Sequence, residues 1–216
     1  AYARAGVDID LANRLKSRLG KRLKATHRPE VLGRVGGFGG LFSARFPGHR
    51  DPVLVASIDG VGTKLKIAFM LDKHDTVGAD LVNHCINDIL TLGAEPLFFL
   101  DYIGAGKLEP RVFGALIKGM AKACTQSGCA LLGGETAQMP GFYPPGEYDV
   151  AGCIVGVVDR KSLIDGSSIR PGDAIIGLPA SGLHTNGYSL ARKIIFEEMG
   201  LGPRDRLPGL RLPVGM

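Results

Sequence analysis

The sequence contains no tryptophan and only four cysteines among its 216 residues. None of them forms a C-x-x-C pair, so neither a zinc ribbon nor a disulfide framework is indicated. Cys85, Cys124, Cys129 and Cys153 have apolar neighbours and are expected to be reduced, structural thiols of a cytoplasmic protein. No apolar run approaches the ~20 residues of a transmembrane helix, and no signal peptide precedes the first charged helix. These absences argue against a membrane-embedded or secreted protein.

A basic patch with interleaved aromatic residues is also missing. The formal net charge is +5 and the sequence pI is about 9.1. The basic residues concentrate in two stretches, 14–34 and 204–211, and no known RNA-binding module accompanies them. A small anionic substrate or solubility explains this charge at least as well as nucleic acid, which is therefore not an expected partner. RNA binding would instead predict an affinity that falls steeply with salt.

Glycine is abundant, with 32 residues that cluster where strands are expected to lead into helices. Hydrophobic periodicity predicts helices over 9–19, 75–92, 110–126 and 188–199, and strands over 53–58, 97–102, 130–132, 150–158 and 174–178. This alternation of strands and helices predicts an α/β (α+β) fold. The turn at 170–173 divides the chain into an expected N-terminal domain, 1–169, and the beginning of a second domain, 170–216.

The segment Asp59-Gly-Val-Gly-Thr-Lys64 directly follows an apolar strand. Its two glycines, Gly60 and Gly62, let backbone N–H groups approach a bound anion, while Thr63 and Lys64 supply a hydroxyl and a cation. Aspartate is a hard oxygen ligand suited to Mg²⁺. The order of residues differs from that of a Walker A loop. The segment therefore indicates either a site for a metal-bridged phosphate or an ordinary glycine-rich turn with solvated charges.

The helix expected over 75–92 is apolar nearly all round and carries one narrow polar stripe. The stripe, at helical spacing, consists of Asp80, Asn83, His84, Asn87, Asp88 and Thr91. Buried unpaired carboxylates cost several kcal/mol each, so these side chains need a cation or hydrogen-bond donors. A metal–phosphate complex would supply both. An internal ion pair or a solvent-facing edge remains the alternative.

Two further segments carry polar residues after short apolar runs. Gly133, Gly134, Glu135 and Thr136 are expected to form a turn that a ligand can approach closely, although a solvated Gly-Gly turn is equally common. If Asp59, Asp88 and Glu135 converge, they could hold one or two Mg²⁺ ions. The segment 181–187 offers hydroxyl, amide and imidazole groups beside a helix start, which suits an anion. His184 is a candidate acid or base there, or else a capping or core histidine.

Taken together, these motifs resemble those of the phosphoribosylformylglycinamidine cyclo-ligase family. The resemblance rests on the order and spacing of 59–64, 83–88, 133–140 and 181–188, and is strengthened by 2–8 and 98–103. The family belongs to a wider ATP-using superfamily that includes formylglycinamidine synthetase, selenophosphate synthetase, thiamine-phosphate kinase and a hydrogenase-maturation protein. Selenophosphate synthetase would require a reactive cysteine near the first glycine-rich loop, whereas the first cysteine here is Cys85. Another superfamily member and a non-catalytic nucleotide-binding module remain the alternatives.

The resemblance implies a homodimer that pairs its N-terminal sheets, binds ATP and Mg²⁺, and closes the imidazole ring of formylglycinamidine ribonucleotide. It implies ATP contacts at Gly37, Gly39, Gly40, Asp59, Gly60, Gly62, Thr63, Lys64, Asn83, Asn87, Asp88, Gly133, Gly134, Glu135 and Thr136. It implies metal ligands at Asp59 and Asp88, to which the chemistry of its side chain adds Glu135, and substrate contacts at Ser181, Gly182, His184, Thr185 and Asn186. The expected catalytic residues are Lys64, Asp88 and His184. The second domain of the family normally continues beyond Met216.

Overall fold

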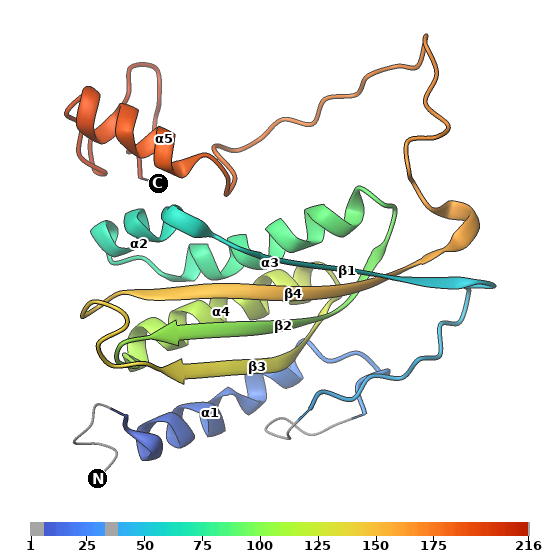
Figure 1. The fold of residues 1–216 in the computed structure, drawn as a ribbon, viewed down its shortest axis with the longest axis horizontal. Coiled ribbons are helices and arrows are strands. Elements are labelled where there is room, and N and C mark those ends of the chain that lie inside the picture. The colour runs from blue at the N-terminus through green and yellow to red at the C-terminus, as the bar shows by residue number, and fades with distance from the viewer. Residues whose placement is uncertain (1–6, 33–38, 216) are drawn as a thin grey trace.

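A four-stranded mixed sheet forms the centre of the computed structural model, which describes residues 7–32 and 39–215 (Figure 1). Its strands are β1 (Pro52–Gly60), β2 (Glu95–Ala105), β3 (Ala130–Gln138) and β4 (Tyr148–Asp159). Their order across the sheet is β1-β4-β2-β3. The β4 strand is antiparallel to both β1 and β2, whereas β2 and β3 run parallel. The strands β1 and β3 are therefore the two edges of the sheet.

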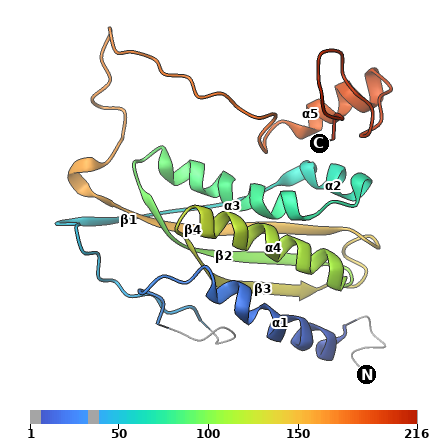
Figure 2. The ribbon, with the colours of Figure 1, turned by 180° about the vertical axis from the view of Figure 1, so that it is seen from behind.

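Helices α1 (Ile9–Lys24), α3 (Asp75–Leu90) and α4 (Pro110–Gln126) lie on one face of this sheet (Figure 2). The core between helices and sheet includes Leu81, Phe99 and Met120, each with no exposed surface. A Cβ atom at Gly119 of α4 would collide with the carbonyl oxygen of Asp75. Glycine at this position therefore allows α3 and α4 to pack with their backbones in close approach.

The other face of the sheet presents apolar side chains to solvent. Along β1, Ser57 and Asp59 reach α3, so the alternate residues Leu54 and Ile58 point away from the helices. They are 60% and 72% exposed. Phe42, from the segment before β1, packs on Phe98 of this face, with ring centroids 5.2 Å apart. When one side of a sheet faces water, that side is usually polar. The exposed apolar residues on this side are therefore unusual.

Two short helical segments follow β1, and the chain returns to them near its C-terminal end. They are the 3₁₀ turn η2 (Gly62–Lys64) and helix α2 (Leu65–Leu71). After β4 and the 3₁₀ turn η3 (Arg160–Ser162), an extended stretch carries the chain away from the sheet and back toward α2 (Figures 1 and 2). There α5 (Tyr188–Arg192) continues directly into the π-helical η4 (Lys193–Glu198).

The α/β class predicted from the sequence is confirmed, and so are the helix over 110–126 and the helical segment that begins at residue 188. The first helix is longer than predicted and extends to Lys24. The four cysteines are free, and all but the partly exposed Cys153 are buried.

Two predictions about strands are wrong. The residues 133–136 lie inside β3 instead of forming a turn, because they continue the pairing with β2 as far as Gln138. The residues 174–178 form no strand; Ile175 is fully exposed and Ile176 is 85% exposed. No other strand lies beside them in the described part of the chain, and an isolated strand leaves its backbone groups unpaired.

Candidate functional site

Asp59 and Asp88 lie on the two sides of the seam between β1 and α3. Asp59 is near the end of β1, and its Oδ2 atom lies 2.6 Å from Nε2 of His84 on α3. Asp88 is one turn further along α3, and its Oδ2 accepts a 2.6 Å hydrogen bond from the hydroxyl of Ser57 on β1. The two reciprocal contacts bring both carboxylates to one edge of the sheet.

A buried thiol, that of Cys85, lies on α3 beside this seam. Burial raises the pKa of Cys85 to about 12, and the negative charges of Asp59 and Asp88 contribute to the increase. The Sγ atom of Cys85 is directed at the carbonyl oxygen of Gly152, 3.5 Å away. Cys85 therefore stays a neutral thiol, as expected for a structural cysteine.

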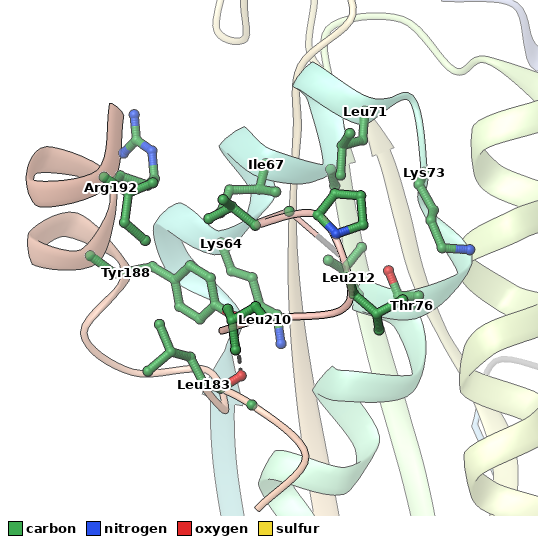
Figure 3. A pocket seen from close by; sticks show the side chains of 18 of the residues that line it. Lys64, Ile67, Leu71, Lys73, Thr76, Leu183, Tyr188, Arg192, Leu210 and Leu212 are labelled. Carbon is green, nitrogen blue, oxygen red and sulfur yellow. Dashed lines mark hydrogen bonds between the residues drawn. The ribbon is translucent and has the colours of Figure 1, made fainter. Parts of the chain in front are cut away.

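Lys64 projects from η2 into a group of polar contacts beside this edge. Its Nζ atom lies 2.5 Å from Oδ2 of Asp80 and donates a 2.7 Å hydrogen bond to the carbonyl oxygen of His184. The same ammonium lies 5.2 Å from the centre of the Tyr188 ring. Figure 3 shows Lys64 between α2, Leu183 and Tyr188. The turn after β1 and the segment 181–188 are thus in direct contact.

A cavity of about 770 Å³ opens between α2, the start of α3 and the C-terminal segments (Figure 3). Lys64 and Asp80 line it, together with Ser181 and Gly182 of the predicted substrate segment. The side chains of His184 and Asn186 are exposed, and Thr185 is 7% exposed. Asp59 and Asp88 are not among the cavity's lining residues, so the cavity contains the predicted phosphate-binding lysine but lies beside the two carboxylates.

The backbone conformation and close packing of the turn after β1 explain why glycine occupies positions 60 and 62. Gly62 has φ of +52°, in the left-handed region that side chains other than glycine disfavour. A Cβ atom at Gly60 would lie 3.1 Å from the carbonyl oxygen of Val150 on β4. Thr63 places its hydroxyl 3.1 Å from that of Ser189, at the start of α5.

Asn83 and Asn87 are exposed on α3. The polar stripe of α3 therefore follows the outer side of the β1 edge.

Four predicted nucleotide-binding residues, 133–136, lie at the opposite edge of the sheet, on β3. Gly133, with φ of +141°, marks the bulge in the β2–β3 pairing. A Cβ atom at Gly134 would collide with the backbone of Asp101, so only glycine fits there. A Cβ atom at Gly40 would lie 2.9 Å from Leu132, which places that residue beside β3. Gly39 precedes it in the described chain, and Gly37 lies outside the described residues.

The three carboxylates predicted to bind metal do not meet within one chain. Asp59 is in register with Gly152 of β4, Gly152 with Asp101 of β2, and Asp101 with Gly134 of β3. Three strand intervals separate Asp59 from the neighbourhood of Glu135, which corresponds to about 14 Å. Glu135 is exposed and pairs with Tyr102, on the sheet face away from α3, while its Oε1 accepts a hydrogen bond from the N–H of Thr136. Within the described residues, no three acidic, histidine or cysteine side chains form a group that could hold a metal.

Comparison with known proteins identifies the family. The family model described as AIR synthase related protein, N-terminal domain, matches residues 44–158, which is more than half of the chain. The chain belongs to this family.

Curated relatives match the AIR synthase related chain over nearly its whole length. A protein of Geobacter sulfurreducens named phosphoribosylformylglycinamidine cyclo-ligase is 62% identical over 209 residues, which cover 97% of this chain and 60% of the relative. A protein of the same name from Geobacillus kaustophilus is 54% identical, over 100% of this chain and 62% of its own length. The chain thus spans about 60% of the length of the relatives that it matches.

Solved structures share the AIR synthase related fold at low sequence identity. Thiamine-monophosphate kinase from Stenotrophomonas maltophilia K279a is 20% identical with a TM-score of 0.53, over 67% of this chain and 43% of its own. The hydrogenase maturation protein HypE, solved in complex with ATP, has the same identity and TM-score, over 74% of this chain and 44% of its own. Both comparisons support the fold. Within the described residues, none of the helices is both long and apolar enough to span a bilayer.

Two charged residues of this AIR synthase related chain have surroundings that the sequence did not predict. Asp80 was placed on the polar stripe, but its pairing with Lys64 depends on how α3 and η2 meet in space. Asp101 lies in the middle of β2 and is only 8% exposed. Desolvation raises its pKa to about 7, although its own backbone N–H and the charge of Lys16 oppose the increase. An aspartate within an otherwise apolar strand was the available signal for Asp101.

Proposed function

We propose that this chain forms the ATP-binding part of a phosphoribosylformylglycinamidine cyclo-ligase. The names of its relatives, at 54–62% identity, suggest this activity. The single observation that carries the proposal is the edge formed by β1 and α3. Asp59 and Asp88 lie at this edge, and Lys64, from the turn after β1, contacts the carbonyl oxygen of His184 beside it. Purine biosynthesis in the cytoplasm would be the corresponding cellular role.

The residues at this edge fit a magnesium–nucleotide complex. Mg²⁺ is usually held by one or two carboxylates together with substrate phosphates, so Asp59 and Asp88 suffice as protein ligands. When bound, the ion would neutralise charge on the transferred phosphoryl group. Lys64 would donate hydrogen bonds to phosphate oxygens, and the backbone N–H groups near Gly60 and Gly62 would lie against the same group.

In the proposed reaction, the formyl amide oxygen of the substrate attacks the γ-phosphorus of ATP. A new P–O bond forms and the bond to the β-phosphate oxygen breaks, which releases ADP. The amidine nitrogen then attacks the activated carbon, closes the ring and expels inorganic phosphate. The protein's part is positioning and charge stabilisation. His184 is assigned to accept the proton of the attacking nitrogen, and Ser181, Gly182, Thr185 and Asn186 to line the substrate side.

A second subunit would complete the nucleotide site. The apolar face that exposes Leu54 and Ile58 is the surface on which we propose that two sheets pair. Glu135 points to this same face from the β3 edge. A two-fold arrangement with β1 of one subunit beside β3 of the other would supply Glu135 of the partner subunit to the edge that carries Asp59 and Asp88.

The activity is tested with a full-length protein that contains this chain. ADP release should require formylglycinamidine ribonucleotide and should yield one aminoimidazole ribonucleotide per ADP. ATP hydrolysis that is indifferent to this substrate would favour another superfamily member. Absence of hydrolysis together with nucleotide binding would favour a non-catalytic module.

The shared site is tested by mixing two inactive full-length variants, Asp88→Asn and Glu135→Gln. If each site combines Asp88 with Glu135 of the partner subunit, mixed dimers contain one intact site. Random mixing should then restore about a quarter of the wild-type activity. If both residues act within one subunit, mixing restores nothing.

The pairing surface is tested by Ile58→Arg, which places a charge on the apolar face. This variant should dissociate the dimer, as measured by light scattering coupled to gel filtration. Ile176→Arg is the matched control, since Ile176 is 85% exposed but belongs to no strand of the sheet. A dimer that survives Ile58→Arg would exclude this surface.

A further inference from the structure

The ammonium group of Lys64 uses two of its three hydrogen-bond donors within the chain. One contacts the carboxylate of Asp80 at 2.5 Å and another the carbonyl oxygen of His184 at 2.7 Å. A lysine has three N–H donors and no acceptor. Among the contacts made by residues 7–32 and 39–215, one donor is therefore left for an incoming acceptor, such as a phosphate oxygen.

The two acceptors come from different parts of the fold. Asp80 belongs to α3, which packs on the sheet, whereas His184 belongs to the segment that returns from the extended stretch after β4. The ring of Tyr188 lies 5.2 Å from the same ammonium, and the hydroxyls of Thr63 and Ser189 are 3.1 Å apart. Lys64, together with the Thr63–Ser189 pair, thus links the turn after β1 to the segment 184–189.

Asp75 and Asp80 of α3 each pair with a lysine, and the two pairs differ in how far they are exposed to water. Asp75 pairs with Lys73, whose side chain is 43% exposed. The side chain of Lys64 is only 14% exposed and that of Asp80 is 31% exposed. Ion pairs that are partly shielded from water are screened less than fully exposed pairs. The Lys64–Asp80 pair therefore restrains its lysine more firmly than the Lys73–Asp75 pair does.

We propose that Asp80 is a positioning residue, which orients Lys64 so that one ammonium joins the nucleotide phosphate to the segment 184–189. This inference rests on the proposed function, because it assumes that Lys64 contacts phosphate. Asp80 itself does not touch the nucleotide. Its negative charge opposes the approach of phosphate, so its contribution is to the orientation of Lys64 and the adjoining segment, and not to ATP affinity.

The first test measures the lysine directly and needs no enzymatic activity. In Asp80→Asn, the labelling of Lys64 by limiting acetic anhydride, quantified by mass spectrometry, should increase about fivefold, as expected for loss of a modest ion pair. Asp80→Glu keeps the charge and should restore most of the protection. Amide hydrogen exchange in residues 184–189 should become faster in Asp80→Asn but not in Asp80→Glu.

The matched control is Asp75→Asn on the same helix. It should raise the labelling of Lys73 and leave that of Lys64 unchanged. Unchanged labelling of Lys64 in Asp80→Asn would overturn the inference, and so would an equal increase in Asp75→Asn.

The second test uses the full-length enzyme. Asp80→Asn should lower kcat about tenfold while the KM for ATP stays the same or falls, because a repulsive charge near the phosphates is removed. A raised KM for ATP at unchanged kcat would overturn the inference. A wild-type enzyme without cyclo-ligase activity would instead refute the proposed function, while the labelling result would still decide whether Asp80 positions Lys64.

Discussion

Replacing the buried Asp101 by asparagine is expected to stabilise the protein at neutral pH and to change how its stability depends on pH. Asp101 lies on β2 between Gly152 and Gly134 of the neighbouring strands, and desolvation raises its pKa from 3.8 to about 7. The folded protein therefore keeps this carboxyl protonated up to about pH 7. The unfolded chain loses the same proton near pH 4.

The sign of the effect follows from proton linkage. Between about pH 4 and pH 7, the folded state binds one more proton at Asp101 than the unfolded state does. The free energy of unfolding therefore falls as pH rises through this range, by about 1.4 kcal/mol per pH unit. A pKa difference of about 3 units corresponds to a total loss of about 4 kcal/mol. Asparagine has almost the same shape and no charge, so Asp101→Asn should escape this loss.

Urea denaturation measured by far-UV circular dichroism suits a protein without tryptophan. As the pH rises from about 5 to about 7, the unfolding free energy of the variant relative to wild type should increase by roughly 2–3 kcal/mol. Asp159→Asn is the control with the opposite sign, because the backbone N–H of Arg50 lowers the pKa of Asp159. Above the pKa of the unfolded chain, the Asp159 carboxylate stabilises the folded protein, and this stabilisation is lost in acid. The reasoning would be refuted if the difference in unfolding free energy between wild type and Asp101→Asn did not change with pH.

Three further predictions concern the seam and the core. Asp88→Asn should leave the thermal unfolding curve nearly unchanged, since the side chain contacts one hydroxyl, and should reduce turnover of the full-length enzyme roughly 10²-fold. Wild-type kinetics in that variant would remove Asp88 from the site. Lys64→Ala should weaken ATP binding roughly tenfold, and calorimetry that finds unchanged affinity would contradict the proposed phosphate contact. Gly119→Ala should lower the free energy of unfolding by about 1–3 kcal/mol, because the added methyl meets the backbone of α3; unchanged urea unfolding would show that α3 and α4 can separate at no cost.

Local signals in the sequence accounted for several elements. Proline at the start of α4 and glycine just after its end mark the bounds of that helix, because Pro110 is preset for the first turn and Gly128 adopts φ of +65°. The turn at 59–64 was recognisable because its glycines, hydroxyl and charges are consecutive. These features depend on neighbours within a few positions along the chain.

Non-local pairing explains where such reasoning failed. The length of β3 is set by its partner β2, so 133–136 became strand although their glycines predicted a turn. The apolar residues 174–178 lack a neighbouring strand among the described residues and remain extended and exposed. Both outcomes depend on what lies beside a segment in space, which the composition of that segment does not reveal.

The amino-acid sequence by itself determined the family, the α/β class and the chemical types at the site, since these follow from residue identity and spacing. Only the tertiary structure decided how those groups are distributed. Strand order separates Glu135 from Asp59 by three strand intervals, and the packing of α3 against β1 brings Asp88 to Ser57 and Asp80 to Lys64. The physical reason is that a sheet places residues by strand order and register, and these depend on hydrogen bonds between segments far apart in the chain.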